Sequence, residues 1–152
     1  MYIGGTEFSL KRRTYEIYVS GCTRRCEGCH NPQLWDFEVG EKVDDNYINK
    51  LINTINDATN LIDNIFIVGG EPLEQPIDEL IYLLKKLKIT NKKIWLFTHY
   101  DNLSLIPKEL FNYIDYIKCG EFIKDSTSIV YYGIELASTN QIIYKVSDLN
   151  II

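Results

Sequence analysis

The sequence predicts an α/β fold with a parallel β-sheet at its core, and three observations lead to this prediction. Short apolar runs typical of buried strands alternate with segments of helical periodicity. Loops that contain glycine, cysteine and polar residues follow the strands. The chain has 152 residues, a common length for one domain, so we expect residues 1–152 to form a single compact unit.

Four segments have the composition of strands in such a core, because they are rich in β-branched, aromatic and other apolar side chains. They are residues 15–19, 64–68, 93–97 and 115–118. The second of them is a continuous apolar run, as in a strand buried on both faces of a parallel sheet.

The segments between these strands predict helices. Residues 44–60 carry isoleucine and leucine at helical spacing, with Asp44 or Asp45 available as an N-cap. Residues 76–88 begin with proline, place four leucines on one face and carry lysines toward the end. Residues 107–114 predict a shorter helix. Beyond Gly120 the pattern changes, and residues 129–132 and 141–146 predict strands or sheet edges without a helix between them.

The most informative groups all come where a predicted strand ends. They are the cysteine loop, Gly69-Gly70-Glu71-Pro72, Thr98-His99-Tyr100 and Cys119-Gly120. Because the carboxyl ends of parallel strands meet at the same edge of a sheet, where α/β proteins bind ligands, we expect these groups to form one site.

Composition excludes several classes of protein. The net charge is −5, and lysine and arginine are scattered, which argues against nucleic-acid binding. No apolar run approaches the roughly 18 residues of a membrane span, and the first residues lack the core of a signal peptide. Three of the four cysteines lie in one tight loop, where they cannot pair comfortably with each other. We therefore expect a reducing, cytoplasmic location without a membrane partner.

The cysteine loop offers three thiolates, Cys22, Cys26 and Cys29, in the spacing Cys-x-x-x-Cys-x-x-Cys. Four thiolates usually complete an iron–sulfur cluster, so three leave one iron open to another molecule. The alternative is a zinc-binding interaction module, with His30 or Cys119 as the fourth ligand. Structural zinc sites, however, usually combine two pairs of ligands separated by about a dozen residues or more, and this chain has one cluster.

Gly69, Gly70 and Glu71 follow a predicted buried strand, 40 residues after Cys29. Glycines at a strand end allow backbone carbonyls to approach a ligand closely, and Glu71 supplies a negative charge for a cationic amine. On their own these residues also fit an ordinary strand-to-helix turn.

Together the two motifs resemble those of radical S-adenosylmethionine (SAM) enzymes. The resemblance implies that the three cysteines bind a 4Fe–4S cluster whose open iron holds the amino and carboxylate groups of SAM. An electron from the cluster then cleaves SAM, and the 5′-deoxyadenosyl radical abstracts hydrogen. By the same resemblance, Gly69, Gly70 and Glu71 bind the amino group of SAM.

Over almost its whole length the chain most resembles the anaerobic ribonucleoside-triphosphate reductase activating proteins. The matching segments are Val19-Ser20-Gly21-Cys22, Cys26-Glu27-Gly28-Cys29, Trp35, residues 94–100, Cys119-Gly120-Glu121-Phe122 and Ala137-Ser138-Thr139-Asn140-Gln141. The family implies a glycyl radical activation reaction: hydrogen is abstracted from a glycine of the large reductase subunit under anaerobic conditions. It also implies a low-potential electron donor such as flavodoxin or ferredoxin.

Three positions depart from that family. His30 stands where tyrosine is usual and resembles the pyruvate formate-lyase activating enzymes, Cys119 replaces an acidic residue, and His99 replaces glycine. Two alternatives therefore stay open: an activase of another glycyl-radical enzyme, or a radical SAM enzyme that modifies a peptide. The activating enzymes of pyruvate formate-lyase are considerably longer, so the chain length favours the reductase activator.

The radical SAM resemblance predicts one radical SAM domain over residues 1–152. A complete (β/α) barrel needs roughly 200 residues, so we expect a partial (β/α) barrel with a parallel sheet core. Its open side would admit a loop of a protein substrate, which would exclude water. We expect no catalytic residue beyond the cluster and SAM.

The remaining expected SAM contacts come from the cysteine loop and the third strand. The resemblance places the backbone of Gly28 next to the adenine. His30 and Asn31 follow the last cysteine and either contact the adenine or ribose or lie in a solvated loop, and we expect Thr98 in the site. The sequence assigns no role to His99, Cys119, Asn140 and Gln141.

Overall fold

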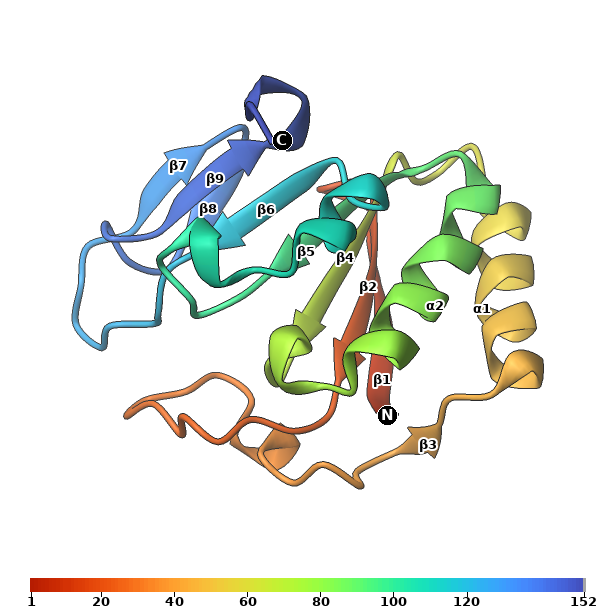
Figure 1. Cartoon of the computed structure of the whole chain (residues 1–152), viewed down its shortest axis with the longest axis horizontal. Coiled ribbons are helices and arrows are strands. Elements are labelled where there is room, and N and C mark those ends of the chain that lie inside the picture. Colours follow the sequence, from red (N-terminus) through yellow and green to blue (C-terminus); the bar gives the residue numbers. More distant parts are fainter. Residues whose placement is uncertain (152) are drawn as a thin grey trace.

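The computed structural model describes residues 1–151 as a mixed α/β structure, a seven-stranded sheet with both α-helices on one face (Figure 1). The strand order is β3-β1-β2-β4-β5-β6-β9, and β7 and β8 form a separate hairpin. The helices are α1 (Asp45–Asp57) and α2 (Ile77–Leu87). The strands are β1 (Tyr2–Ser9), β2 (Thr14–Val19), β3 (Glu41–Lys42), β4 (Asn64–Gly69), β5 (Lys93–Phe97), β6 (Tyr116–Cys119), β7 (Ile129–Tyr131), β8 (Ile134–Leu136) and β9 (Ile142–Lys145).

The four predicted core strands are confirmed as β2, β4, β5 and β6, which pair in parallel. Val19 pairs with Gly69, and Phe97 pairs with Lys118. The loops that follow these four strands therefore leave the sheet at the same edge, as the sequence predicts.

The rest of the sheet is antiparallel. β1 pairs with β2 and β3, and β9 pairs with β6. β1 is not among the predicted strands, and its Gly4 and Gly5 have low strand propensity. Backbone pairing with β2 nevertheless extends over this segment, with a register shift between Ile3 and Gly5. Tertiary pairing therefore outweighs local propensity here.

The α/β class and the parallel core are confirmed, but the chain is less helical than expected. Residues 44–60 and 76–88 form the α-helices, slightly shortened. The short helix predicted over residues 107–114 is a 3₁₀ helix, Lys108–Asn112. The predicted strands of residues 129–132 and 141–146 are present as β7 and β9, and β8 lies between them.

The two faces of the sheet differ in what covers them. The face toward α1 and α2 holds the main core, in which Ile17, Ile67 and Leu96 are fully buried. Side chains alternate along a strand, so the neighbours of these residues point to the opposite, helix-free face. A smaller apolar cluster lies there, in which Phe66 and Trp95 pack with residues of β8 and β9.

Across residues 1–151 no helix is long and apolar enough to cross a membrane.

We expect Asp44→Ala to lower the free energy of unfolding by about 1 kcal/mol, because the Asp44 side chain accepts a hydrogen bond from Tyr47 N at 2.8 Å and caps α1. Urea denaturation of the protein measures this. Asp57→Ala at the other end of α1 is the matched control, since an acidic residue there opposes the helix dipole. An equal loss in both variants would contradict the capping role.

Candidate functional site

A cavity of about 350 Å³ lies where the loops after β2, β4 and β5 meet the helix-free face of the sheet. Residues of the cysteine loop, the Gly69–Glu71 turn, the β8 region and the strands β2, β4, β5 and β6 line it. It thus lies at the edge where the carboxyl ends of parallel strands are expected to bind ligands.

Nearly all of the residues predicted for the site line this one cavity. They are Cys22, Cys26, Cys29, His30, Asn31, Gly69, Gly70, Glu71 and Thr98. Gly28 does not line it, and a Cβ built there would lie 3.2 Å from Lys124 and 3.4 Å from Phe122. The structure thus brings these residues together, and their roles toward a cluster and SAM stay predictions.

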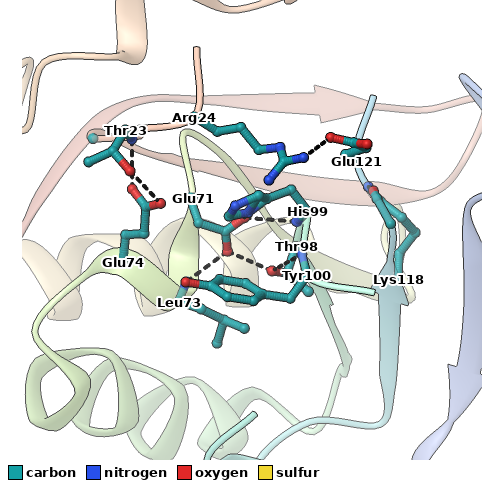
Figure 2. A network of polar contacts seen from close by, with 12 residues as sticks. Thr23, Arg24, Glu71, Leu73, Glu74, Thr98, His99, Tyr100, Lys118 and Glu121 are labelled. Carbon is teal, nitrogen blue, oxygen red and sulfur yellow. Dashed lines mark hydrogen bonds and ion pairs between the residues drawn. The ribbon is translucent and has the colours of Figure 1, made fainter. Parts of the chain in front are cut away.

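Backbone hydrogen bonds hold the cysteine loop to neighbouring segments. Cys22 N donates to Trp35 O at 3.2 Å, and Gly21 N donates to Leu34 O at 2.8 Å. Thr23 donates from its backbone N and its hydroxyl to the Glu74 carboxylate at 2.7 and 2.8 Å (Figure 2). The loop is therefore tied both to the segment that follows it and to the turn after β4.

The three loop thiols are half-buried and free. Burial raises the pKa of the Cys22 thiol, while backbone N–H groups of Arg24 and Arg25 donate to it and oppose that rise. Asn31 N donates to Cys29 Sγ at 3.4 Å. Hydrogen bonds to sulfur tune iron–sulfur clusters, so the environment of these thiols fits a 4Fe–4S cluster.

Within residues 1–151 no three His, Cys, Asp or Glu side chains converge closely enough to hold one metal ion.

Cys119 is separate from this group of thiols. It is 2% exposed in the core on the helix side, and it does not line the cavity. Burial raises the pKa of its thiol to about 12, which disfavours the thiolate form that a metal ligand needs.

Gly70 joins the turn after β4 to the start of the cysteine loop. Gly70 N donates to Val19 O at 2.7 Å, and Glu71 N donates to Gly21 O at 2.8 Å. A Cβ at Gly70 would lie 2.4 Å from Gly21 O, so only glycine fits. The sequence predicts a close approach of this backbone to a ligand, and the structure shows a close approach to the chain itself.

The Glu71 carboxylate is the polar centre of the site. It is 2% exposed and accepts hydrogen bonds from Leu73 N at 2.9 Å, Thr98 Oγ1 at 2.7 Å and His99 N at 2.8 Å. His99 Nδ1 lies 2.5 Å from Glu71 Oε2, which completes four contacts (Figure 2). A carboxylate offers about four acceptor positions, so the protein itself occupies those of Glu71.

Sequence reasoning missed cavity residues on the helix-free face of the sheet, among them Glu16, Tyr18 and Lys118. Glu16 is 4% exposed and accepts from Thr14 Oγ1 at 3.0 Å and Tyr18 Oη at 2.8 Å. Burial is the largest cause of the raised pKa of Tyr18, and the neighbouring Glu16 carboxylate raises it further. The available signal was a charged residue inside an otherwise apolar strand, as Glu16 and Lys118 both are.

Three thiols at the edge of an α/β sheet define an iron–sulfur protein with a single cluster. A protein family described as a 4Fe-4S single cluster domain matches residues 12–144. The anaerobic ribonucleoside-triphosphate reductase-activating protein of Haemophilus influenzae is 32% identical over 136 residues, which cover 85% of each chain. The protein of the same name from Escherichia coli K12 is 27% identical over 135 residues, 84% of this chain and 85% of the relative.

A phage protein of the same name extends this comparison. The protein from Enterobacteria phage T4 is 30% identical over 112 residues, 72% of this chain and 70% of the relative. The chain belongs to the anaerobic ribonucleoside-triphosphate reductase-activating proteins, within the 4Fe-4S single cluster domain family.

We expect Glu71→Ala to lower the free energy of unfolding by about 1–3 kcal/mol, because the buried donors of Thr98 and His99 would lose their acceptor. Urea denaturation of the cluster-free protein measures this. Glu135→Ala is the control, since Glu135 also lines the cavity but is exposed, and it should change stability by less than about 0.5 kcal/mol. Equal stability of both variants would contradict the central role of Glu71.

Proposed function

We propose that this chain is the activating enzyme of an anaerobic ribonucleoside-triphosphate reductase. In this proposal it binds a 4Fe–4S cluster and SAM in the cavity, cleaves SAM reductively and generates a glycyl radical on the reductase. The observation that supports this most is that Cys22, Cys26, Cys29 and the Gly69–Glu71 turn line the same cavity. The 32% identity to a named activating protein also supports it.

When bound, the reduced cluster supplies the electron that splits SAM, and the deoxyadenosyl fragment abstracts a hydrogen atom from glycine. The chain's own residues hold and orient these groups. The three cysteine thiolates would hold the cluster, with one iron left open to SAM. The backbone carbonyls of Gly69 and Gly70 accept hydrogen bonds from the SAM ammonium. Since the carboxylate of Glu71 is already occupied, it positions Thr98 and His99 beside the ligand.

The adenosine end of SAM lies in this proposal along the cysteine loop. His30 and Asn31 line the cavity and contact the adenine or ribose. The ring of His30 packs against Phe122 with 4.8 Å between ring centroids, which holds the imidazole in place. The backbone of Gly28 approaches the adenine from the loop, outside the cavity lining.

The helix-free face is the side from which a protein substrate would enter. The sheet is open, and we interpret its parallel core as a partial (β/α) barrel of the radical SAM type. A glycine-bearing loop of the reductase would cover the cavity and exclude water. Flavodoxin or ferredoxin would supply the low-potential electron, and the reaction would take place in the cytoplasm.

The experiment that tests this function is anaerobic incubation of the reconstituted protein with the large reductase subunit, SAM and a reductant. We expect a glycyl radical signal by electron paramagnetic resonance, which appears only when all components are present. SAM cleavage without a radical on the reductase would instead select an activase of another glycyl-radical enzyme or a peptide-modifying enzyme. Stoichiometric zinc without iron or sulfide after anaerobic purification would overturn the enzyme reading.

We expect Cys26→Ala to abolish cluster binding and SAM cleavage together, because two remaining loop thiolates cannot hold the cluster. Iron and sulfide analysis and visible absorbance measure the first effect, and 5′-deoxyadenosine formation measures the second. Cys119→Ala is the matched control and should keep the full iron content, since Cys119 is buried away from the cavity. Loss of the cluster in both variants would contradict the prediction that Cys26 is a cluster ligand and Cys119 is not.

A further inference from the structure

Trp35 carries a buried polar atom that the proposed function does not use. Its indole Nε1 is buried and has no hydrogen-bond partner within residues 1–151. The other such side-chain atom in these residues is Gln75 Oε1, which is an acceptor, so Trp35 Nε1 is the unpaired buried donor of this part of the chain. A buried indole N–H usually has an acceptor, and one without an acceptor is costly. The atom therefore points to a partner supplied by a bound group.

The backbone holds Trp35 against the cysteine loop. Trp35 follows the 3₁₀ helix Pro32–Leu34 as its C-cap, and its carbonyl accepts a hydrogen bond from Cys22 N at 3.2 Å. The guanidinium of Arg25 lies over the indole, 5.7 Å from the ring centroid. The backbone N–H of Arg25 also donates to the Cys22 thiol, so one loop residue contacts both the first thiol and the indole.

The indole belongs to the cavity of the thiols. Trp35 lines this cavity together with the three thiols of the cysteine loop. Cys22 and Trp35 are also the two residues that the cavity shares with a neighbouring hollow of the surface. The acceptor for Nε1 has to come from what fills the cavity beside Cys22, and the sulfur atoms of an iron–sulfur cluster are acceptors that belong at this place.

The charges around Cys22 give such a donor a purpose. Burial raises the pKa of the Cys22 thiol, and the carboxylates of Glu74 and Glu71 raise it further, so negative charge at this sulfur is disfavoured. A cluster that accepts an electron becomes more negative, and the same carboxylates therefore oppose its reduction. An N–H directed at a cluster sulfur acts in the opposite sense, because hydrogen bonds to sulfur stabilise the reduced state and raise the reduction potential.

We propose that the indole Nε1–H of Trp35 donates a hydrogen bond to a sulfur atom of the cluster on the side of Cys22 and raises the reduction potential of the cluster. Trp35 is then a residue that tunes the cluster and eases its reduction by the low-potential donor. This proposal rests on the cluster of the proposed function and needs neither SAM nor the reductase.

The first test is the reduction potential of the reconstituted cluster, measured anaerobically without SAM. Trp35→Phe keeps an aromatic ring and removes the N–H. We expect the equilibrium constant for cluster reduction to fall about tenfold, which for a one-electron couple is a potential about 59 mV more negative. Trp95→Phe is the matched control and should keep the potential of the wild type, since Trp95 Nε1 donates to Asn64 Oδ1 at 3.0 Å and Trp95 does not line the cavity.

The second test detects the hydrogen bond directly. The chain has two tryptophans, so in Trp95→Phe an indole labelled with the heavy nitrogen isotope reports on Trp35 alone. We expect pulsed electron paramagnetic resonance of the reduced cluster to show a magnetic coupling to this nitrogen. The coupling should be present in the wild type and in Trp95→Phe, and absent in Trp35→Phe.

Iron content and the urea midpoint are compared in all variants, because a structural role alone would change these without the nitrogen coupling. The proposal for Trp35 is wrong if labelled Trp95→Phe shows no coupling, if Trp35→Phe has the potential of the wild type, or if Trp95→Phe shifts the potential equally. If Trp35→Phe takes up no cluster, the coupling in labelled Trp95→Phe decides. A wild type that takes up no cluster would overturn the proposed function as well.

Discussion

The close approach of Gly70 to Gly21 is the constraint on which the site depends. Two backbone hydrogen bonds, at 2.7 and 2.8 Å, connect the turn after β4 to the end of β2 and the start of the cysteine loop. A Cβ at Gly70 would fall 2.4 Å from Gly21 O, so the junction closes only with glycine there. Backbone hydrogen bonds thus join the loop that would hold a cluster to the turn that would hold SAM.

Buried polar contacts extend this junction to the next strand. Glu71 connects the end of β4 to Thr98 and His99 after β5, and Glu74 connects the same turn to Thr23 in the cysteine loop. Each acceptor position of the Glu71 carboxylate is satisfied inside the protein. These hydrogen bonds offset the free-energy cost of burying the carboxylate and fix its orientation. Such a site orients a ligand through groups that are already held in place.

The asymmetry of the sheet separates the stable core of the chain from its cavity. α1 and α2 bury the main apolar core on one face. The other face is only partly covered, where the hairpin of β7 and β8 packs through Leu136 against Phe66 and Trp95. The cavity opens beside this hairpin, so stability comes from one side of the sheet and ligand access from the other.

The sequence alone determined the parallel core, α1 and α2, and the list of residues that meet at the sheet edge, because periodicity and strand-end motifs are local signals. It did not reveal β1, whose glycines disfavour a strand until pairing with β2 supplies the hydrogen bonds. Only the tertiary structure separated Cys119 from the other thiols and placed Lys118 and Glu16 in the cavity. Contacts with segments distant in the chain decide what covers each face of a strand and which donors bind a buried carboxylate. Local sequence patterns do not contain this information.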